Sequence, residues 1–135
     1  MTRIDTQVQT IQSIYAAFGR GAIGEILERV TSDAEFSFAG AAREVPWHGP
    51  WHGSAQLERF FETIGSAVEF EAFEPLAFAA SSEHVAVRLH LRYKVRHTGK
   101  VVEQHQVHWW TLRDGRVSAL VHFEDTAQVI AAVRA

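Results

Sequence analysis

Two histidines in apolar, strand-like segments are the residues best placed to do chemistry. His108 lies within residues 101–112, and His122 lies near the end of the segment that follows the turn at 114–115. A neutral imidazole can accept or donate a proton near pH 7 without a large shift of its pKa. Tyr15, in an early helical segment, can add a hydroxyl donor. Proton transfer of this kind needs no metal ion and no organic cofactor, so we predict neither.

The other histidines give weaker signals. His48 and His52 are four residues apart, which would suit a metal pair on a helix, but they lie in a loop rich in Gly, Pro and Trp. His105 and His108 would point to opposite faces of a strand. We therefore predict no metal site. A lone histidine in an apolar strand is more often a structural residue than a catalyst, and this alternative stays open for His108 and His122.

Composition indicates a single globular domain over residues 1–135. The hydrophobic fraction is 47% and the mean hydropathy is -0.09, which is enough to build a core. A net charge of -3 and a pI near 6.2 argue against nucleic acid as a partner. Because there is no cysteine, disulfides and thiolate chemistry are excluded. No segment has the apolar length of a signal peptide or a membrane span, so we expect a cytoplasmic protein without a membrane partner.

Helices are predicted mainly in the first half of the chain. Apolar residues recur three and four positions apart over 4–18 and again over 23–30. A third stripe covers 57–68, and Ser54 is a suitable N-cap for it. Residues 34–40 alternate as a strand between the second helix and the loop at 40–53. Asp125 is a suitable cap for a short final helix.

The second half predicts a sheet of antiparallel strands. From Val85 to Val95 the odd-numbered residues are apolar and the even-numbered ones are mostly charged, which is typical of a strand with one buried face. Turns at 98–99 and 114–115 lead into two further strands. Residues from 69 onward form another strand, in which Pro75 marks an edge or a bulge. The fold class is α+β, with a curved antiparallel sheet wrapped around three helices and an internal pocket.

Several local strings resemble the nuclear-transport-factor-2-like superfamily, and most closely its SnoaL-like and ketosteroid-isomerase-related branch. The strings are IYAAFGRG at 14–21, TSDA at 31–34, GPWHG at 49–53, WTLRDGRV at 110–117 and FEDT at 123–126. The resemblance implies a cone-shaped α+β barrel with a pocket. It also implies a homodimer formed through the outer face of the sheet, where we expect Val101, Val107 and Trp109.

The resemblance also bears on catalysis, residue by residue. The carboxylate base of the isomerases falls at Phe38, so a steroid isomerase of the usual mechanism is not expected. Their oxyanion-binding tyrosine falls near Ile14, one residue from Tyr15, and their protonated aspartate matches His108. In the fold's epoxide hydrolases, aspartates occupy the positions of His90 and His122. SnoaL-like cyclases use an acid on the last strand, for which His122 is the nearest candidate.

The same resemblance predicts the pocket lining. It turns Gln104, Gln106 and Trp110 inward beside His108, and Leu120 and Glu124 inward beside His122. Turn geometry alone would instead place residue 108 opposite 121, so a bulge decides whether the two histidines share a face. The other predicted substrate contacts are Phe38, Phe61, Leu89, Trp47 and Trp51. The two tryptophans form either a lid over the pocket or packing between the loop and the third helix.

Two functions remain open. The first is a cofactor-independent isomerase or cyclase that acts on a small, largely apolar, cyclic or polyketide-like molecule, with His122 transferring the proton and His108 and Tyr15 assisting. The second is a non-catalytic module that binds a hydrophobic small molecule, or an accessory subunit. Convergence of these three side chains on one point would favour the enzyme.

Overall fold

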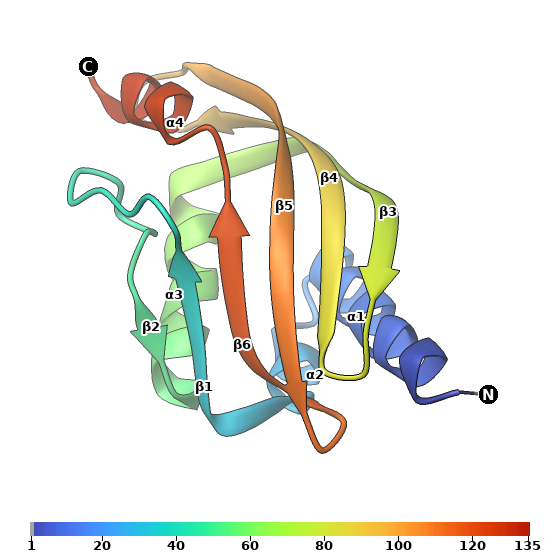
Figure 1. Cartoon of the computed structure of the whole chain (residues 1–135). Helices are drawn as coiled ribbons and strands as arrows, with labels where there is room; N and C mark the ends of the chain where they lie inside the picture. The colour runs from blue at the N-terminus through green and yellow to red at the C-terminus, as the bar shows by residue number, and fades with distance from the viewer. Residues whose placement is uncertain (1) are drawn as a thin grey trace.

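A curved six-stranded sheet wraps around three helices in the computed structural model, which describes residues 2–135 (Figure 1). The strands lie in the order β2 (Trp51–His52), β1 (Val30–Phe38), β6 (Arg116–Phe123), β5 (Val101–Arg113), β4 (His84–Val95) and β3 (Val68–Ala80). The edge strands β2 and β3 are not paired with each other in the described chain, so the sheet is curved but open. The predicted α+β class is confirmed.

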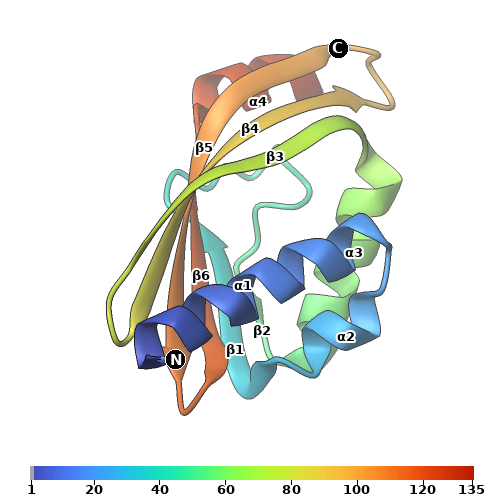
Figure 2. The ribbon, with the colours of Figure 1, turned by 90° about the vertical axis from the view of Figure 1, so that its right-hand side faces the viewer.

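Three helices lie on one side of the curved sheet: α1 (Arg3–Gly19), α2 (Ile23–Leu27) and α3 (Ser54–Ala67) (Figure 2). The fourth, α4 (Thr126–Val133), lies at one end of the sheet. A sheet that bends around helices in this way leaves a hollow between the two layers wherever side chains do not meet. None of the helices within residues 2–135 is long and apolar enough to cross a membrane.

The sheet is mixed rather than purely antiparallel. Strands β3 to β6 form the predicted antiparallel meander, but β1 pairs with β6 in parallel. The expectation of an antiparallel sheet was therefore wrong for this one pair. Alternation along a strand reports which face is buried, and it carries no information about the direction of the neighbouring strand. Pro75 lies on the edge strand β3 next to a break in register, as its sequence position predicted.

Helix ends follow the sequence with one exception. Asp125 caps α4, because its side chain accepts a hydrogen bond from the backbone of Gln128, as predicted. The predicted N-cap at Ser54 was wrong: Gly53 is the N-cap of α3, and Ser54 is the first helical residue. Gly53 has a φ of 81°, which a side chain would strain, so the chain enters α3 through a backbone conformation that glycine alone adopts readily.

The carboxyl end of α4 is fixed by the turn between β4 and β5. The Thr98 hydroxyl donates to the carbonyl oxygen of Ala132 at 2.7 Å, and the Lys100 ammonium donates to that of Arg134 at 2.8 Å. These bonds satisfy carbonyl groups that have no partner inside the helix. Because α4 directly follows β6, they also hold the end of β6 in place.

The outer face of the sheet carries both apolar and charged side chains. Val101, Val107 and Trp109 are each about two-fifths exposed on β5, on the face where we expected them. On neighbouring β4, His90 contacts Glu74 and Glu103 at 2.8 Å each. The homodimer through this face stays a prediction.

Candidate functional site

A β-bulge places His108 and His122 on the same face of the sheet. Beyond the turn, β5 and β6 first pair as Arg113–Arg116 and Leu112–Val117, then as Thr111–Ala119, which leaves Ser118 without an opposite residue. His108 consequently pairs with His122. If the same residues paired without a bulge, residue 121 would lie opposite His108 and His122 would point to the outer face. The two imidazole ring centres are 4.7 Å apart.

Both histidines line a cavity between the sheet and α1 to α3. The cavity has a volume of about 80 Å³, which is room for several waters. Its wall is mostly aromatic and aliphatic. Among the residues predicted to form the site, the wall includes Tyr15, Phe38, Trp47, Phe61, Gln106, His108, Trp110, Leu120, His122 and Glu124. Leu89 and Trp51 are not part of the wall, because Leu89 is fully buried in the core and Trp51 packs against Phe60 of α3.

Tyr15 joins α1 to the histidine pair. Its hydroxyl oxygen lies 2.8 Å from Nδ1 of His108 and 3.0 Å from Nε1 of Trp110. The indole N–H can only donate, so the hydroxyl accepts from Trp110 and has its own proton to give to His108. We therefore assign the His108 proton to Nε2, where it is a donor.

His122 has the complementary proton arrangement. Its Nδ1 lies 2.9 Å from the carbonyl oxygen of Ser37 on β1, and a carbonyl can only accept, so we assign the ring proton to Nδ1. Nε2 is then an unprotonated acceptor. The ring also stacks on Phe38, with centres 3.9 Å apart and planes 5° apart, which fixes its orientation.

The Nε2 atoms of both histidines are open to the cavity. Neither has a hydrogen-bond partner among residues 2–135, yet no fully buried side-chain nitrogen or oxygen in that range is unsatisfied. Both Nε2 atoms must therefore be reachable from the space that the rings line. The pair presents one N–H donor and one nitrogen acceptor to a ligand.

Burial keeps His108, His122 and Tyr15 uncharged. Burial lowers the pKa of His122 to about 4, although the hydrogen bond to the carbonyl oxygen of Ser37 acts in the opposite direction. Burial, together with the nearby His122, lowers the pKa of His108 well below its usual value. Burial also raises the pKa of the Tyr15 hydroxyl, against the effect of its bond to Trp110. All three groups are therefore neutral at pH 7.

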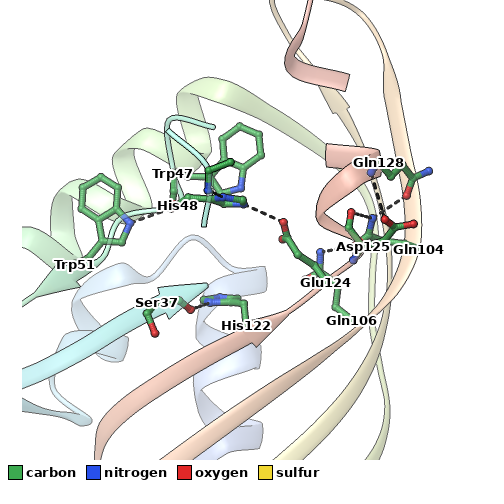
Figure 3. A network of polar contacts seen from close by, with 11 residues as sticks. Ser37, Trp47, His48, Trp51, Gln104, Gln106, His122, Glu124, Asp125 and Gln128 are labelled. Atoms are coloured by element: carbon green, nitrogen blue, oxygen red, sulfur yellow. Dashed lines mark hydrogen bonds and ion pairs between the residues drawn. The ribbon is translucent and has the colours of Figure 1, made fainter. Parts of the chain in front are cut away.

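A second buried pair was missed by sequence reasoning. The side chains of His48 and Glu124 are each 2% exposed, and Nε2 of His48 lies 2.9 Å from Oε2 of Glu124 (Figure 3). Glu124 was predicted to line the pocket, but its partner comes from a loop 76 residues earlier in the chain. No periodicity in the sequence could have placed the two together.

The loop at 40–53 closes part of the wall. Trp47 is buried beside Tyr93, while the Trp51 indole donates to the carbonyl oxygen of Trp47 at 2.9 Å (Figure 3). The two tryptophans were predicted to form either a lid or packing between the loop and the third helix. Trp51 packs the loop onto α3, whereas Trp47 forms part of the cavity wall. Within residues 2–135, no three His, Cys, Asp or Glu side chains come together as metal ligands.

Comparison with known proteins identifies the family. The SnoaL-like domain family matches residues 11–120 of the chain. The chain is a SnoaL-like protein. No curated protein matches it. An NTF2-like protein from Burkholderia xenovorans is 27% identical, with a TM-score of 0.89 over 97% of this chain and 98% of the other.

Two more distant structures share the SnoaL-like fold. A candidate polyketide cyclase from Xanthomonas campestris is 15% identical, with a TM-score of 0.79 over 98% of this chain and all of the other. A candidate isomerase from Bacillus subtilis is 18% identical, with a TM-score of 0.82 over 98% and 95% of the two chains. At these identities the likeness concerns the fold alone.

The Tyr15→Phe variant is expected to lose about 1–3 kcal/mol of unfolding free energy, because the buried Trp110 N–H and His108 Nδ1 both lose their partner. Urea denaturation measures the loss. The matched control is Tyr93→Phe, which removes a hydroxyl that also lines the cavity but has no hydrogen-bond partner among residues 2–135. Equal stability of the Tyr15→Phe variant and the unaltered protein would contradict the assigned network.

Proposed function

We propose that this SnoaL-like protein catalyses proton transfer on a small, largely apolar, cyclic ketone, without a cofactor. The observation that carries the proposal is the pairing of His108 and His122, which brings an unprotonated Nε2 and an Nε2–H donor to one cavity wall. A carbon acid needs both groups, a base for the C–H proton and a donor for the oxygen that becomes negative.

The proposed step begins with a ketone whose carbonyl oxygen accepts the hydrogen bond of His108 Nε2. Nε2 of His122 removes a proton from the neighbouring carbon, and the electrons of the broken C–H bond form an enolate that His108 stabilises. Where the enolate is conjugated with a C=C bond, return of the proton from His122 to the far carbon gives an isomer. Attack of the enolate carbon on a second carbonyl of the same molecule instead closes a ring, and the alkoxide formed from that carbonyl takes the proton back from His122. Tyr15 orients His108 throughout.

The burial of His122 restricts the substrate. With a pKa of about 4, this imidazole is a weak base, and its protonated form is costly in an apolar wall. The enolate formed beside it offsets part of that cost by ion pairing. Efficient transfer therefore requires an activated C–H bond, as in a ketone flanked by an aromatic ring or by a second carbonyl. The same fold is found in a candidate polyketide cyclase and a candidate isomerase, so a reaction of this class is compatible with the fold.

Hydrogen exchange tests the proposal without knowledge of the natural substrate. The probe is 2-tetralone, an apolar bicyclic ketone with benzylic α-hydrogens, dissolved in deuterium oxide with the protein. We expect the protein to accelerate deuterium incorporation at the α-carbon, as followed by proton NMR. Saturable binding without acceleration would instead favour the non-catalytic binding module, for which the aromatic Phe38 at the usual position of the base is the supporting observation.

A further inference from the structure

The proposed step leaves unused Glu124, the one carboxylate that residues 2–135 contribute to the cavity wall. Oε2 of Glu124 contacts His48, while Oε1 has no hydrogen-bond partner among the described residues. Since no fully buried oxygen in residues 2–135 is unsatisfied, Oε1 is reachable from the cavity that Glu124 lines. A carboxylate oxygen in an otherwise aromatic wall is a strong and selective hydrogen-bond acceptor.

The loop fixes the proton of His48, and thereby the role of Glu124. The backbone N–H of Ala42 donates to Nδ1 of His48 at 2.8 Å, so that nitrogen must be unprotonated. The ring proton is then on Nε2 and is donated to Glu124. His48 therefore orients Glu124. It donates a hydrogen bond to one carboxylate oxygen, Oε2, and leaves the other, Oε1, free to accept a hydrogen bond from a ligand.

Phe38 separates this acceptor from the histidine pair. Its ring stacks on His48, with centres 4.7 Å apart, and on His122, with centres 3.9 Å apart. The His48–Glu124 pair and the Nε2 atoms of His108 and His122 thus lie on two sides of one aromatic ring. A ligand that reaches both sides needs two polar groups separated by a flat apolar framework.

We infer that Glu124 binds a hydroxyl group of the ligand, so that the pocket selects cyclic hydroxy ketones over ketones without a hydroxyl. That the ligand is a ketone rests on the proposed function, whereas its hydroxyl group is inferred from the buried His48–Glu124 pair alone. Burial raises the pKa of the Tyr93 hydroxyl, and the negative charge of Glu124 adds to this effect; both residues line the cavity.

Binding of two matched probes tests the hydroxyl site. Isothermal titration compares 2-naphthol with 2-methoxynaphthalene, which has the same framework but no hydroxyl proton. A hydrogen bond to a carboxylate is expected to make 2-naphthol bind about tenfold tighter. In the Glu124→Gln variant the preference is expected to fall below about threefold, because the amide lacks the charge. Glu58→Gln, on the exposed surface of α3, is the control and should retain the preference.

Several results would overturn the inference: no binding of 2-naphthol to the unaltered protein, equal affinity for the two probes, or a preference that survives in Glu124→Gln. The comparison on the unaltered protein does not depend on the folding of a variant. Because 2-naphthol has no carbonyl, this experiment is independent of 2-tetralone exchange. A hydroxyl preference without exchange would reject the proposed reaction and leave the hydroxyl site standing.

Discussion

Replacement of His122 by glutamine is expected to slow the exchange of 2-tetralone by a factor of about 10² or more, because general-base catalysis contributes on that scale. Glutamine is close to histidine in size, and its amide N–H can still donate to the carbonyl oxygen of Ser37. Its amide oxygen, however, does not accept a proton at neutral pH. The variant therefore removes the base while retaining the main packing and polar contacts.

Proton NMR of the variant and of a matched control distinguishes this role from general damage. His105→Gln changes an exposed histidine on the outer face of β5 and should exchange 2-tetralone at the original rate. Binding of 2-methoxynaphthalene to His122→Gln verifies that the cavity is intact. Exchange within threefold of the unaltered rate in His122→Gln, with the cavity intact, would exclude His122 as the base.

Acid is expected to destabilise the protein well above the pH at which carboxylates are protonated. The pKa of His122 falls from 6.5 in the unfolded chain to about 4 in the fold, so between these values the unfolded state binds more protons. Stability must then fall as the pH is lowered through this range. The loss from His122 alone is about 3 kcal/mol. The pKa of His108 is also lowered in the fold, so His108 adds to this loss of stability.

Urea denaturation between about pH 4.5 and 6 isolates this effect. Asp33, whose pKa is lowered to about 2 mainly by its bond to Arg113, loses its stabilising contribution only at lower pH. His90 has a raised pKa, so its contribution is fully present below 6.5 and is lost only at higher pH. The pH dependence should be clearly shallower in His122→Gln. An equal slope in the variant and the unaltered protein would contradict a buried neutral His122.

The sequence was most informative where one face of an element is buried. The alternation from Val85 to Val95 correctly predicted which side chains of β4 face the core, because a strand with one wet face must repeat every two residues. The apolar stripes of α1 and α3 follow from the same requirement on a helix. Similarity of local strings to the family then placed most of the cavity wall, including Gln106 and Leu120.

The rest depends on contacts between distant parts of the chain. The bulge at Ser118 leaves no mark in composition, because an unpaired residue in a hairpin needs no special side chain. His48 belongs to a loop without periodicity, and only its contact with Glu124 gives it a role. Leu89 was predicted to contact substrate, yet the curvature of the sheet places it in the closed part of the core.

The unpaired Ser118 has a consequence for how such pockets diverge. Substitutions exchange one side chain at a time, but a change of pairing that closed the bulge, with Ser118 opposite Thr111, would turn every later side chain of β6 to the other face of the sheet. Val121 would then replace His122 in the cavity wall, while the backbone path stayed much the same. The gain or loss of a bulge in a hairpin is therefore an efficient route by which this architecture acquires or abandons a reaction.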